Sequence, residues 1–308
     1  MPLTYAELER FYEGLVSKAR QCGVACAITS GMACVAFGVA AATRDCDLLC
    51  APDAAGDFFS LLFDTPLRGR LPSYRGNLTA PLDSRWLRGG WTSHFVWSVP
   101  EGEAFLDVFG IAPRGSSPWQ SESRGPYAGL HTVAEMKRTD RDKDWPYTTA
   151  LGLKLLEQGD SRGWLHLFNY EALSETSKKL ACPSEMVSLR PVLSLLPEGG
   201  DRLEIALKAE IEFWHRLDQL RLKVYERAVR PYMLAVRGDP LAAATAPLPE
   251  QHQARLRHAE LLLPANPLRQ YGIERLIAEA KAKTAQMLPA SALDWLPDVS
   301  ACFKFFAE

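Results

Sequence analysis

Two aspartates, Asp45 and Asp47, stand one residue apart in a short segment, residues 45–51, that the sequence predicts to be a strand. Because side chains alternate along a strand, both carboxylates face one side and Cys46 faces the other. Two carboxylates about 7 Å apart along a strand supply the oxygen ligands that Mg²⁺ prefers, and Mg²⁺ often completes its shell with substrate phosphates. The pair therefore indicates a candidate site for Mg²⁺, or for Mn²⁺.

Small residues precede this acidic pair. Ser30 and Gly31 follow a predicted buried strand, residues 24–29, and lead into a predicted helix, residues 32–39. Backbone N–H groups at such a turn can bind an anion. An isolated Asp-x-Asp is more often a solvated strand end. A phosphate-binding turn followed by paired carboxylates is more specific, because metal-assisted phosphoryl or nucleotidyl transfer needs both.

The whole segment resembles the signature of the nucleotidyltransferase (DNA polymerase β-like) superfamily. The matching residues are Gly31-Met32-Ala33, Gly38, Thr43 and Asp45-Cys46-Asp47-Leu48-Leu49. In that family a strand, a Gly/Ser turn, a helix and an Asp-x-Asp strand follow in this order. The sequence looks most like the bacterial branch that includes minimal nucleotidyltransferases and AbiEii-type toxins, and the resemblance covers about the first half of the chain.

The resemblance implies further site residues. The family takes a third carboxylate from a later strand, and Asp107 interrupts the apolar second strand of a predicted hairpin. Residues 135–144 are similar to the family's Lys...Arg-x-Lys-Asp segment, which contributes to nucleotide binding. Without the first motif, such alternating charges are typical of an exposed helix end.

The implied reaction is transfer of a nucleoside monophosphate from an NTP to a hydroxyl acceptor, with release of pyrophosphate. Asp45, Asp47 and Asp107 would be the catalytic residues and the ligands of Mg²⁺ or Mn²⁺. The implied substrate-binding residues are Ser30, Gly31, Thr43, Lys137, Arg141, Lys143 and Asp144. One of the two lysines would neutralise charge on the leaving group, and Asp144 would orient a basic side chain. The acceptor, whether protein, RNA or small molecule, is not specified by the sequence.

Two departures from the family pattern favour an alternative. Ala41 stands where the family commonly has Arg, and Tyr147 stands where it tends to have an acid. Both would suit a catalytically degenerate nucleotidyltransferase-fold protein that acts as a nucleotide- or partner-binding module. The three retained acids favour an active enzyme.

Composition narrows the remaining classes. The 308 residues are 47% hydrophobic and 23% charged, which is ordinary for a globular protein and excludes a disordered chain. The net charge of -2 gives no overall field that would attract nucleic acid. The sequence contains neither a P-loop motif nor the nucleophile elbow of an esterase.

The cysteines and the hydropathy of the sequence indicate the cellular compartment in which the protein is expected. Seven cysteines, without an apolar segment at the start of the sequence, predict free thiols in a reducing cytoplasm. Five of them, at positions 22, 26, 34, 46 and 50, lack zinc-knuckle spacing and are better interpreted as small buried residues. Residues 22–43 are uncharged but rich in small residues, so we expect no membrane span.

The predicted fold class is α/β, with a small mixed sheet. A nucleotidyltransferase-like domain is expected over residues 1–160 and a mainly helical region over 161–308. The expected elements are a helix over 5–21 that starts at a capping box, hairpin strands over 94–99 and 104–111, and helices that begin at Asp201 and Asn266. Residues 66–92 look irregular, and Trp86, Trp91 and Trp97 are expected to be core or loop anchors.

Overall fold

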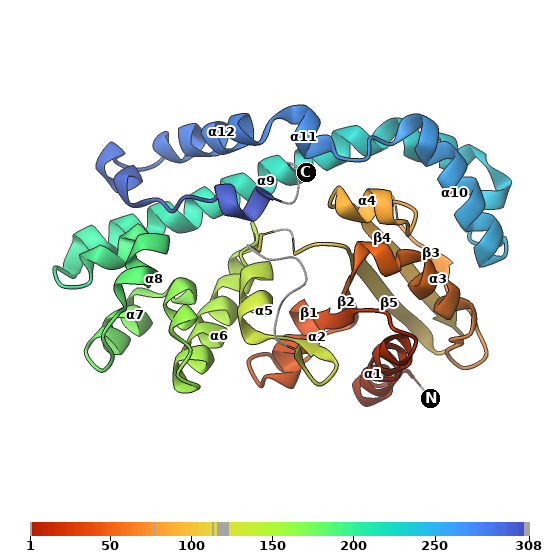
Figure 1. Ribbon diagram of the computed structural model, residues 1–308, viewed down its shortest axis with the longest axis horizontal. Coiled ribbons are helices and arrows are strands. Elements are labelled where there is room, and N and C mark those ends of the chain that lie inside the picture. The colour runs from red at the N-terminus through yellow and green to blue at the C-terminus, as the bar shows by residue number, and fades with distance from the viewer. Residues whose placement is uncertain (1, 77, 113, 116–122, 305–308) are drawn as a thin grey trace.

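The computed structural model describes residues 2–76, 78–112, 114–115 and 123–304. One open, seven-stranded mixed sheet is followed by a large helical C-terminal region (Figure 1). All of the described strands precede residue 129, and residues 130–304 form only helices and their connections. The predicted α/β class is therefore confirmed, while the domain division at residue 160 stays a prediction.

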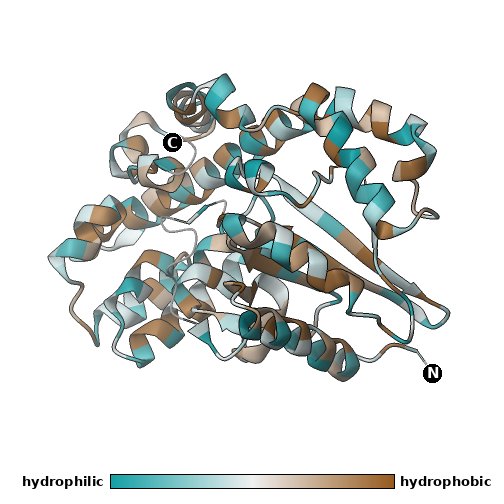
Figure 2. Ribbon diagram, turned by 45° about the vertical axis from the view of Figure 1, so that its right-hand side comes forward, coloured by the Kyte–Doolittle hydropathy of each residue, from teal (hydrophilic) through white to brown (hydrophobic). Residues whose placement is uncertain are grey.

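The strands are ordered β3-β4-β5-β2-β1-β7-β6 across the sheet. Their bounds are β1 (Cys26–Thr29), β2 (Asp45–Cys50), β3 (Ser73–Tyr74), β4 (Thr92–Val99), β5 (Gly102–Phe109), β6 (Ser123–Arg124) and β7 (Tyr127–Ala128). β2 pairs antiparallel with β1 and parallel with β5, and β5 forms the predicted antiparallel hairpin with β4. Apolar residues are concentrated along the central strands (Figure 2).

The first helix, α1 (Tyr5–Gln21), has the bounds that the capping box predicts. Thr4 Oγ1 accepts a hydrogen bond from the Glu7 N–H, which satisfies one of the unpaired donors of the first turn. The Tyr12 side chain is buried, and its hydroxyl donates to the Phe105 carbonyl oxygen at 2.8 Å. This bond fixes α1 against β5.

Eleven further helices are described alongside short 3₁₀ turns. They are α2 (Ser30–Ala36), α3 (Ala55–Phe63), α4 (Ser84–Arg88), α5 (Leu130–Met136), α6 (Trp145–Glu157), α7 (Tyr170–Ser177), α8 (Ser184–Leu189), α9 (Gly200–Gly238), α10 (Leu248–Leu262), α11 (Pro267–Tyr271) and α12 (Ile273–Ala285). The 39-residue α9 spans much of the molecule (Figure 1). No helix within the described residues has both the length and the apolar character to cross a membrane.

The helical region packs directly on the sheet-bearing half. Trp86 and Trp91 share one apolar cluster with the buried face of α9. The Tyr225 hydroxyl of α9 donates to the Gly89 carbonyl oxygen at 2.7 Å. Like Trp97, both tryptophans are almost fully buried, which confirms that they are core anchors.

Two expectations about local structure are wrong. Residues 66–92 are not wholly irregular, since they contain β3 and α4, and Asp83 caps α4 by accepting the Arg85 N–H. The helix expected from Asn266 is divided into α11 and α12, because Gly272 has a φ of +96°. A residue in that region of φ interrupts a right-handed helix.

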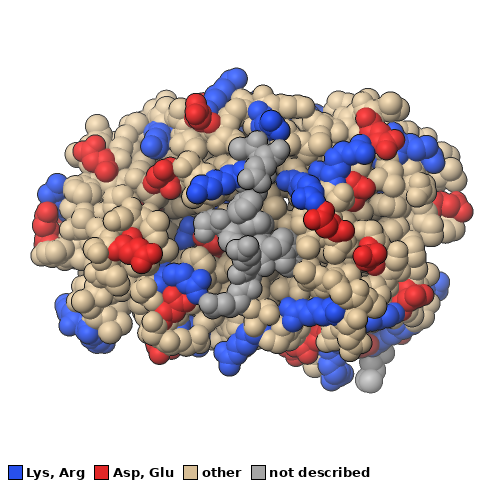
Figure 3. Space-filling model, viewed as in Figure 1, with Lys and Arg blue, Asp and Glu red and all other residues tan. Residues whose placement is uncertain are grey.

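Charges on the surface are mixed. Figure 3 shows Lys and Arg side chains interspersed with Asp and Glu over the face that is in view. This distribution agrees with the near-zero net charge of the chain. A long-range field that steers a polyanion to this face is therefore not expected.

Candidate active site

Asp47 and Asp107 lie side by side on neighbouring strands. β2 and β5 are parallel, and the Cα atom of Asp47 is opposite that of Asp107. Adjacent strands are about 4.8 Å apart, so the two carboxylates leave the same face of the sheet close together. Asp45, two residues earlier on β2, lies on that face and is exposed, while Cys46 is fully buried on the other. The predicted alternation is therefore confirmed.

The carboxyl group of Asp47 has an unusual environment. Burial and the neighbouring charge of Asp107 raise its pKa from 3.8 to about 6, and Asp45 adds to the increase. A hydrogen bond from the Ser30 side chain and the positive charge of Lys137 act in the opposite direction. Crowding of carboxylates at a half-buried position is the main physical feature of this site.

Asp107 has two basic partners that sequence reasoning missed. Arg75 Nη2 lies 2.5 Å from Asp107 Oδ1, and His94 Nδ1 lies 2.8 Å from the same oxygen. His94 is opposite Asp107 across the β4–β5 hairpin. Arg75 follows β3, and its guanidinium lies over the Phe105 ring at 4.7 Å. The charge of Asp107 is thus compensated by Arg75.

These contacts bear on metal binding. Among the described residues, no group of three or more His, Cys, Asp or Glu side chains is arranged to hold a metal ion. The Asp45 carboxylate forms no hydrogen bond or ion pair with a described residue. Asp47 accepts a hydrogen bond from the Ser30 side chain. Both carboxylates therefore have oxygen atoms that could bind a hard cation. Asp107, in contrast, is held by Arg75 and His94. Carboxylate oxygens are the ligands that Mg²⁺ prefers, but binding of Mg²⁺ by this pair, like the three-carboxylate site, stays a prediction.

Ser30 and Gly31 are the first two residues of α2, where Ser30 bonds to Asp47 and Gly31 lies against Thr43. Ser30 has a φ of +53°, in the left-handed region that non-glycine residues rarely adopt. A Cβ atom on Gly31 would lie 2.7 Å from Thr43 Oγ1. Glycine is therefore required here by the close approach of Thr43, not by its own φ. Nucleotide binding by these residues stays a prediction.

The basic segment after α5 is organised around Asp144. Lys137 Nζ lies 3.2 Å from Asp144 Oδ1, while Thr139 Oγ1 and Arg141 Nη2 lie 2.7 Å and 2.6 Å from Oδ2. Burial raises the pKa of Asp144, but these three neighbours outweigh it and hold the pKa below its ordinary value. Because Lys137 also lowers the pKa of Asp47, it connects this cluster electrostatically to the acidic pair.

The remaining predicted residues are placed differently. Lys143 is exposed and forms no ion pair with a described residue. Tyr147 lies with its ring 5.8 Å from Lys137 Nζ, which places it beside the site. Ala41 is exposed and supplies no charge.

Four of the five clustered cysteines are buried on the sheet and on α2, whereas Cys22 is exposed, so the expectation of a buried residue is wrong at that position. Cys26, Cys34, Cys46 and Cys50 are free thiols with almost no exposed surface, as expected. Burial raises the pKa of Cys26 and of Cys34 to about 11. Thiols of this kind stay protonated and behave as small apolar groups.

His94 lies in the predicted hairpin, but the predicted strands, 94–99 and 104–111, leave a four-residue turn. The turn in the structure has two residues, and this register puts His94 opposite Asp107. Arg75 gave no such signal, since it lies in a segment rich in Gly and Pro. No family model matches the chain, and no curated protein matches it.

Proposed function

We propose that the protein is a Mg²⁺- or Mn²⁺-dependent nucleotidyltransferase that transfers a nucleoside monophosphate from an NTP to a hydroxyl acceptor. The observation that carries the proposal is the in-register pair of Asp47 and Asp107, with Lys137 acting electrostatically on Asp47. Closely spaced carboxylates can bind the metal ion, and a buried lysine can neutralise phosphate charge, so together they suit a metal–triphosphate complex. The free buried thiols suit the reducing cytoplasm expected from the sequence.

Asp45 and Asp47 would hold the cation, which would supply positive charge to the triphosphate and to the leaving pyrophosphate. With a pKa of about 6, Asp47 binds a proton in weakly acidic solution and is ionised at neutral pH. A proton and a cation therefore compete for the same oxygen atoms. Transfer is expected to increase with pH through this range.

Asp107 and Lys137 would have separate roles. Asp107, next to His94, would accept the proton of the acceptor hydroxyl once Arg75 has left it. Lys137 is almost fully buried and held by Asp144. A fixed cation that is shielded from water stabilises developing phosphate charge better than a solvated one.

One observation favours the alternative of a nucleotide- or partner-binding module without catalysis. Arg75 compensates Asp107, the acid that the resemblance implies as the third metal ligand. In a binding protein this pair would be permanent. In an enzyme, Arg75 must leave Asp107 when substrate binds, and it would then be available to the triphosphate.

Incubation with each of the four α-³²P-labelled NTPs, with Mg²⁺ or Mn²⁺, tests the proposal. The chain itself, bulk RNA and glycerol would serve as protein, RNA and small-molecule hydroxyl acceptors. We expect label to be transferred to one of them, and we expect Asp47→Asn and Asp107→Asn to abolish the transfer. Asp294→Asn, which neutralises an exposed acid in the C-terminal region, is the matched control. NTP binding without label transfer would support the binding module instead.

A further inference from the structure

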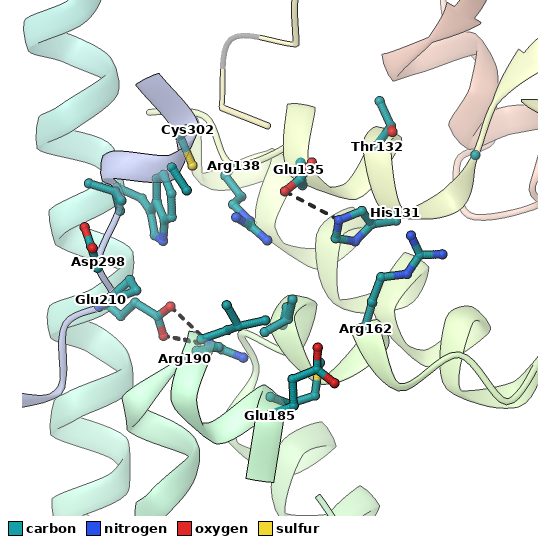
Figure 4. Close-up of a pocket in the computed structure, with 18 residues that line it drawn as sticks. His131, Thr132, Glu135, Arg138, Arg162, Glu185, Arg190, Glu210, Asp298 and Cys302 are labelled. Carbon is teal, nitrogen blue, oxygen red and sulfur yellow. Dashed lines mark hydrogen bonds and ion pairs between the residues drawn. The ribbon is translucent and has the colours of Figure 1, made fainter. Parts of the chain in front are cut away.

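A cavity of about 380 Å³ lies apart from the acidic pair, in the helical part of the molecule (Figure 4). Its walls come from α5, α8, α9 and the segments 162–165 and 297–302. Neither Asp47, Asp107 nor Lys137 lines it. Cavities of this size commonly hold small molecules.

Two buried donors in its wall have no acceptor among the described residues. Arg138 is 7% exposed, and its Nε forms no hydrogen bond with the described residues, although Nη2 contacts His166 Nδ1 at 3.1 Å. Trp214 is 3% exposed, and its ring lies 5.1 Å from the Arg138 guanidinium. Trp214 Nε1 likewise forms no hydrogen bond with the described residues. Figure 4 shows the Arg138 guanidinium pointing into the cavity. Buried donors are almost always satisfied, so both indicate an acceptor that a ligand would supply.

The acids around the cavity do not fill this need. Glu210 is bonded to Arg190 Nε through both carboxylate oxygens, at 3.0 Å and 2.9 Å. Glu135 lies 3.5 Å from His131 Nε2, and the dashed lines in Figure 4 mark both contacts. No carboxylate of the described residues forms an ion pair with Arg138. Its positive charge is thus available to an anion.

Other lining residues restrict the ligand. Glu185 and Asp298 are exposed, and such acids disfavour a polyanion such as a triphosphate. An apolar body would be accommodated by Leu165, Met186, Leu189, Val299 and Ala301. The wall therefore combines the buried guanidinium group of Arg138 with apolar surface.

We propose that this cavity binds a small organic anion, one carboxylate or phosphate monoester on an apolar body, whose oxygens accept hydrogen bonds from Arg138 Nε and Trp214 Nε1. Each of the two N–H groups can donate to one oxygen of either head group, and a hydrogen bond between a guanidinium and an anion is of the stronger, charge-assisted kind. The assignment does not depend on the proposed transfer reaction, because the two sites share no residue.

Calorimetric titration of the full chain with benzoate, phenyl phosphate and neutral benzamide tests the assignment. We expect benzoate or phenyl phosphate to bind with one-to-one stoichiometry at millimolar concentration or below, and to raise the midpoint of thermal unfolding as a ligand of the folded state does. The stronger of the two identifies the head group. Absence of saturable binding by both anions, or equal binding of benzamide, would overturn the proposal.

Two variants locate the binding. Arg138→Lys keeps the charge but removes the guanidinium group, and Trp214→Phe removes only a donor and part of the ring. Each should weaken anion binding at least tenfold. Trp91→Phe is the matched control, because the Trp91 Nε1 donates to the Pro264 carbonyl oxygen at 2.9 Å, away from the cavity. It should bind as wild type does. Wild-type affinity in Trp214→Phe and in a folded Arg138→Lys would refute the site.

Discussion

Asp47 and Asp107 are opposite each other on parallel strands, yet only Asp107 has an arginine against its carboxylate. Asp47 is bonded to Ser30, and burial together with Asp107 raises its pKa to about 6. Two acids of the same type thus differ in charge compensation because of their neighbours. Two nearby carboxylates whose neighbours differ in this way commonly have different chemical roles in an active site.

The first prediction concerns Asp47→Asn. The pKa of Asp47 in the folded state, about 6, is above its ordinary value of 3.8. Between the ordinary pKa of 3.8 and the folded-state pKa of about 6, the folded form binds the proton more tightly than the unfolded form. The free energy of unfolding that Asp47 contributes therefore decreases as pH rises through this range. Asp47→Asn should therefore raise the free energy of unfolding at about pH 7, by up to roughly 3 kcal/mol. Below about pH 4 the two proteins should be equally stable.

Urea unfolding across this pH range measures the effect, with Asp294→Asn as the control for loss of one negative charge. A second arm adds Mg²⁺-NTP, which should stabilise the wild type and not Asp47→Asn, since a ligand stabilises the state that it binds. A variant that unfolds at lower urea than wild type at neutral pH would show that Asp47 is structural. Full Mg²⁺-NTP stabilisation of the variant would contradict the metal-site interpretation.

The second prediction concerns Arg75→Gln. Removing the guanidinium releases Asp107 to join the acidic pair as an oxygen ligand. We expect Mg²⁺ to bind more tightly, by roughly tenfold, which corresponds to about 1.4 kcal/mol. Calorimetric titration with Mg²⁺ alone is the measurement. Arg70→Gln, at an exposed position of the same segment, makes the same charge change away from Asp107 and should leave affinity unaltered. Equal affinities in the two variants would show that Arg75 does not compete with the cation.

Short-range patterns account for the part of this site that the sequence predicts. Alternation along β2 places Asp45 and Asp47 on one face of the sheet. The position of Arg75 could not be predicted in this way. Arg75 follows β3, and β3 is hydrogen-bonded to a helix that is distant in the sequence. Tyr74 N–H donates to Gln251 Oε1 of α10 at 3.0 Å. A contact so remote along the chain leaves no periodic signal.

The organic-anion cavity escaped sequence reasoning for the same reason. Arg138 follows α5 and Trp214 belongs to α9, and nothing in either segment indicates the other. Trp214 lies on the buried face of α9. Its unsatisfied Nε1 depends on how two helices pack, which is a property of the assembled fold.

The third prediction compares two glycines. A Cβ atom on Gly31 would lie 2.7 Å from Thr43 Oγ1, whereas one on Gly14, in α1, would have no neighbour within 4 Å. Gly31→Ala should lower the free energy of unfolding by about 1–3 kcal/mol through overpacking. Gly14→Ala should raise it by up to about 1 kcal/mol through helix propensity. Urea unfolding of both variants measures this. A stabilising effect at Gly31 would show that Thr43 moves aside freely.

The last prediction concerns the buried pair of Lys137 and Asp144. Asp144 is 1% exposed, and its pKa lies below 3.8 despite burial, because Lys137, Thr139 and Arg141 stabilise the carboxylate. A lowered pKa in the folded state means that the stabilisation is present above the ordinary pKa. It is lost as pH falls through the folded-state value. Asp144→Asn should thus be most destabilising at neutral pH.

The expected loss at about pH 7 is roughly 3–5 kcal/mol, since Lys137 stays buried without its counter-charge. The difference from wild type should shrink as the solution is acidified, because the wild-type carboxylate is then protonated as well. Asp142→Asn is the control, as the Asp142 side chain is 99% exposed, and it should change stability by less than about 0.5 kcal/mol. Urea unfolding between about pH 3 and 7 gives both comparisons. A loss below about 1 kcal/mol in Asp144→Asn would mean that Asp144 does not hold Lys137 in place, and the fixed cation beside Asp47 would need another explanation.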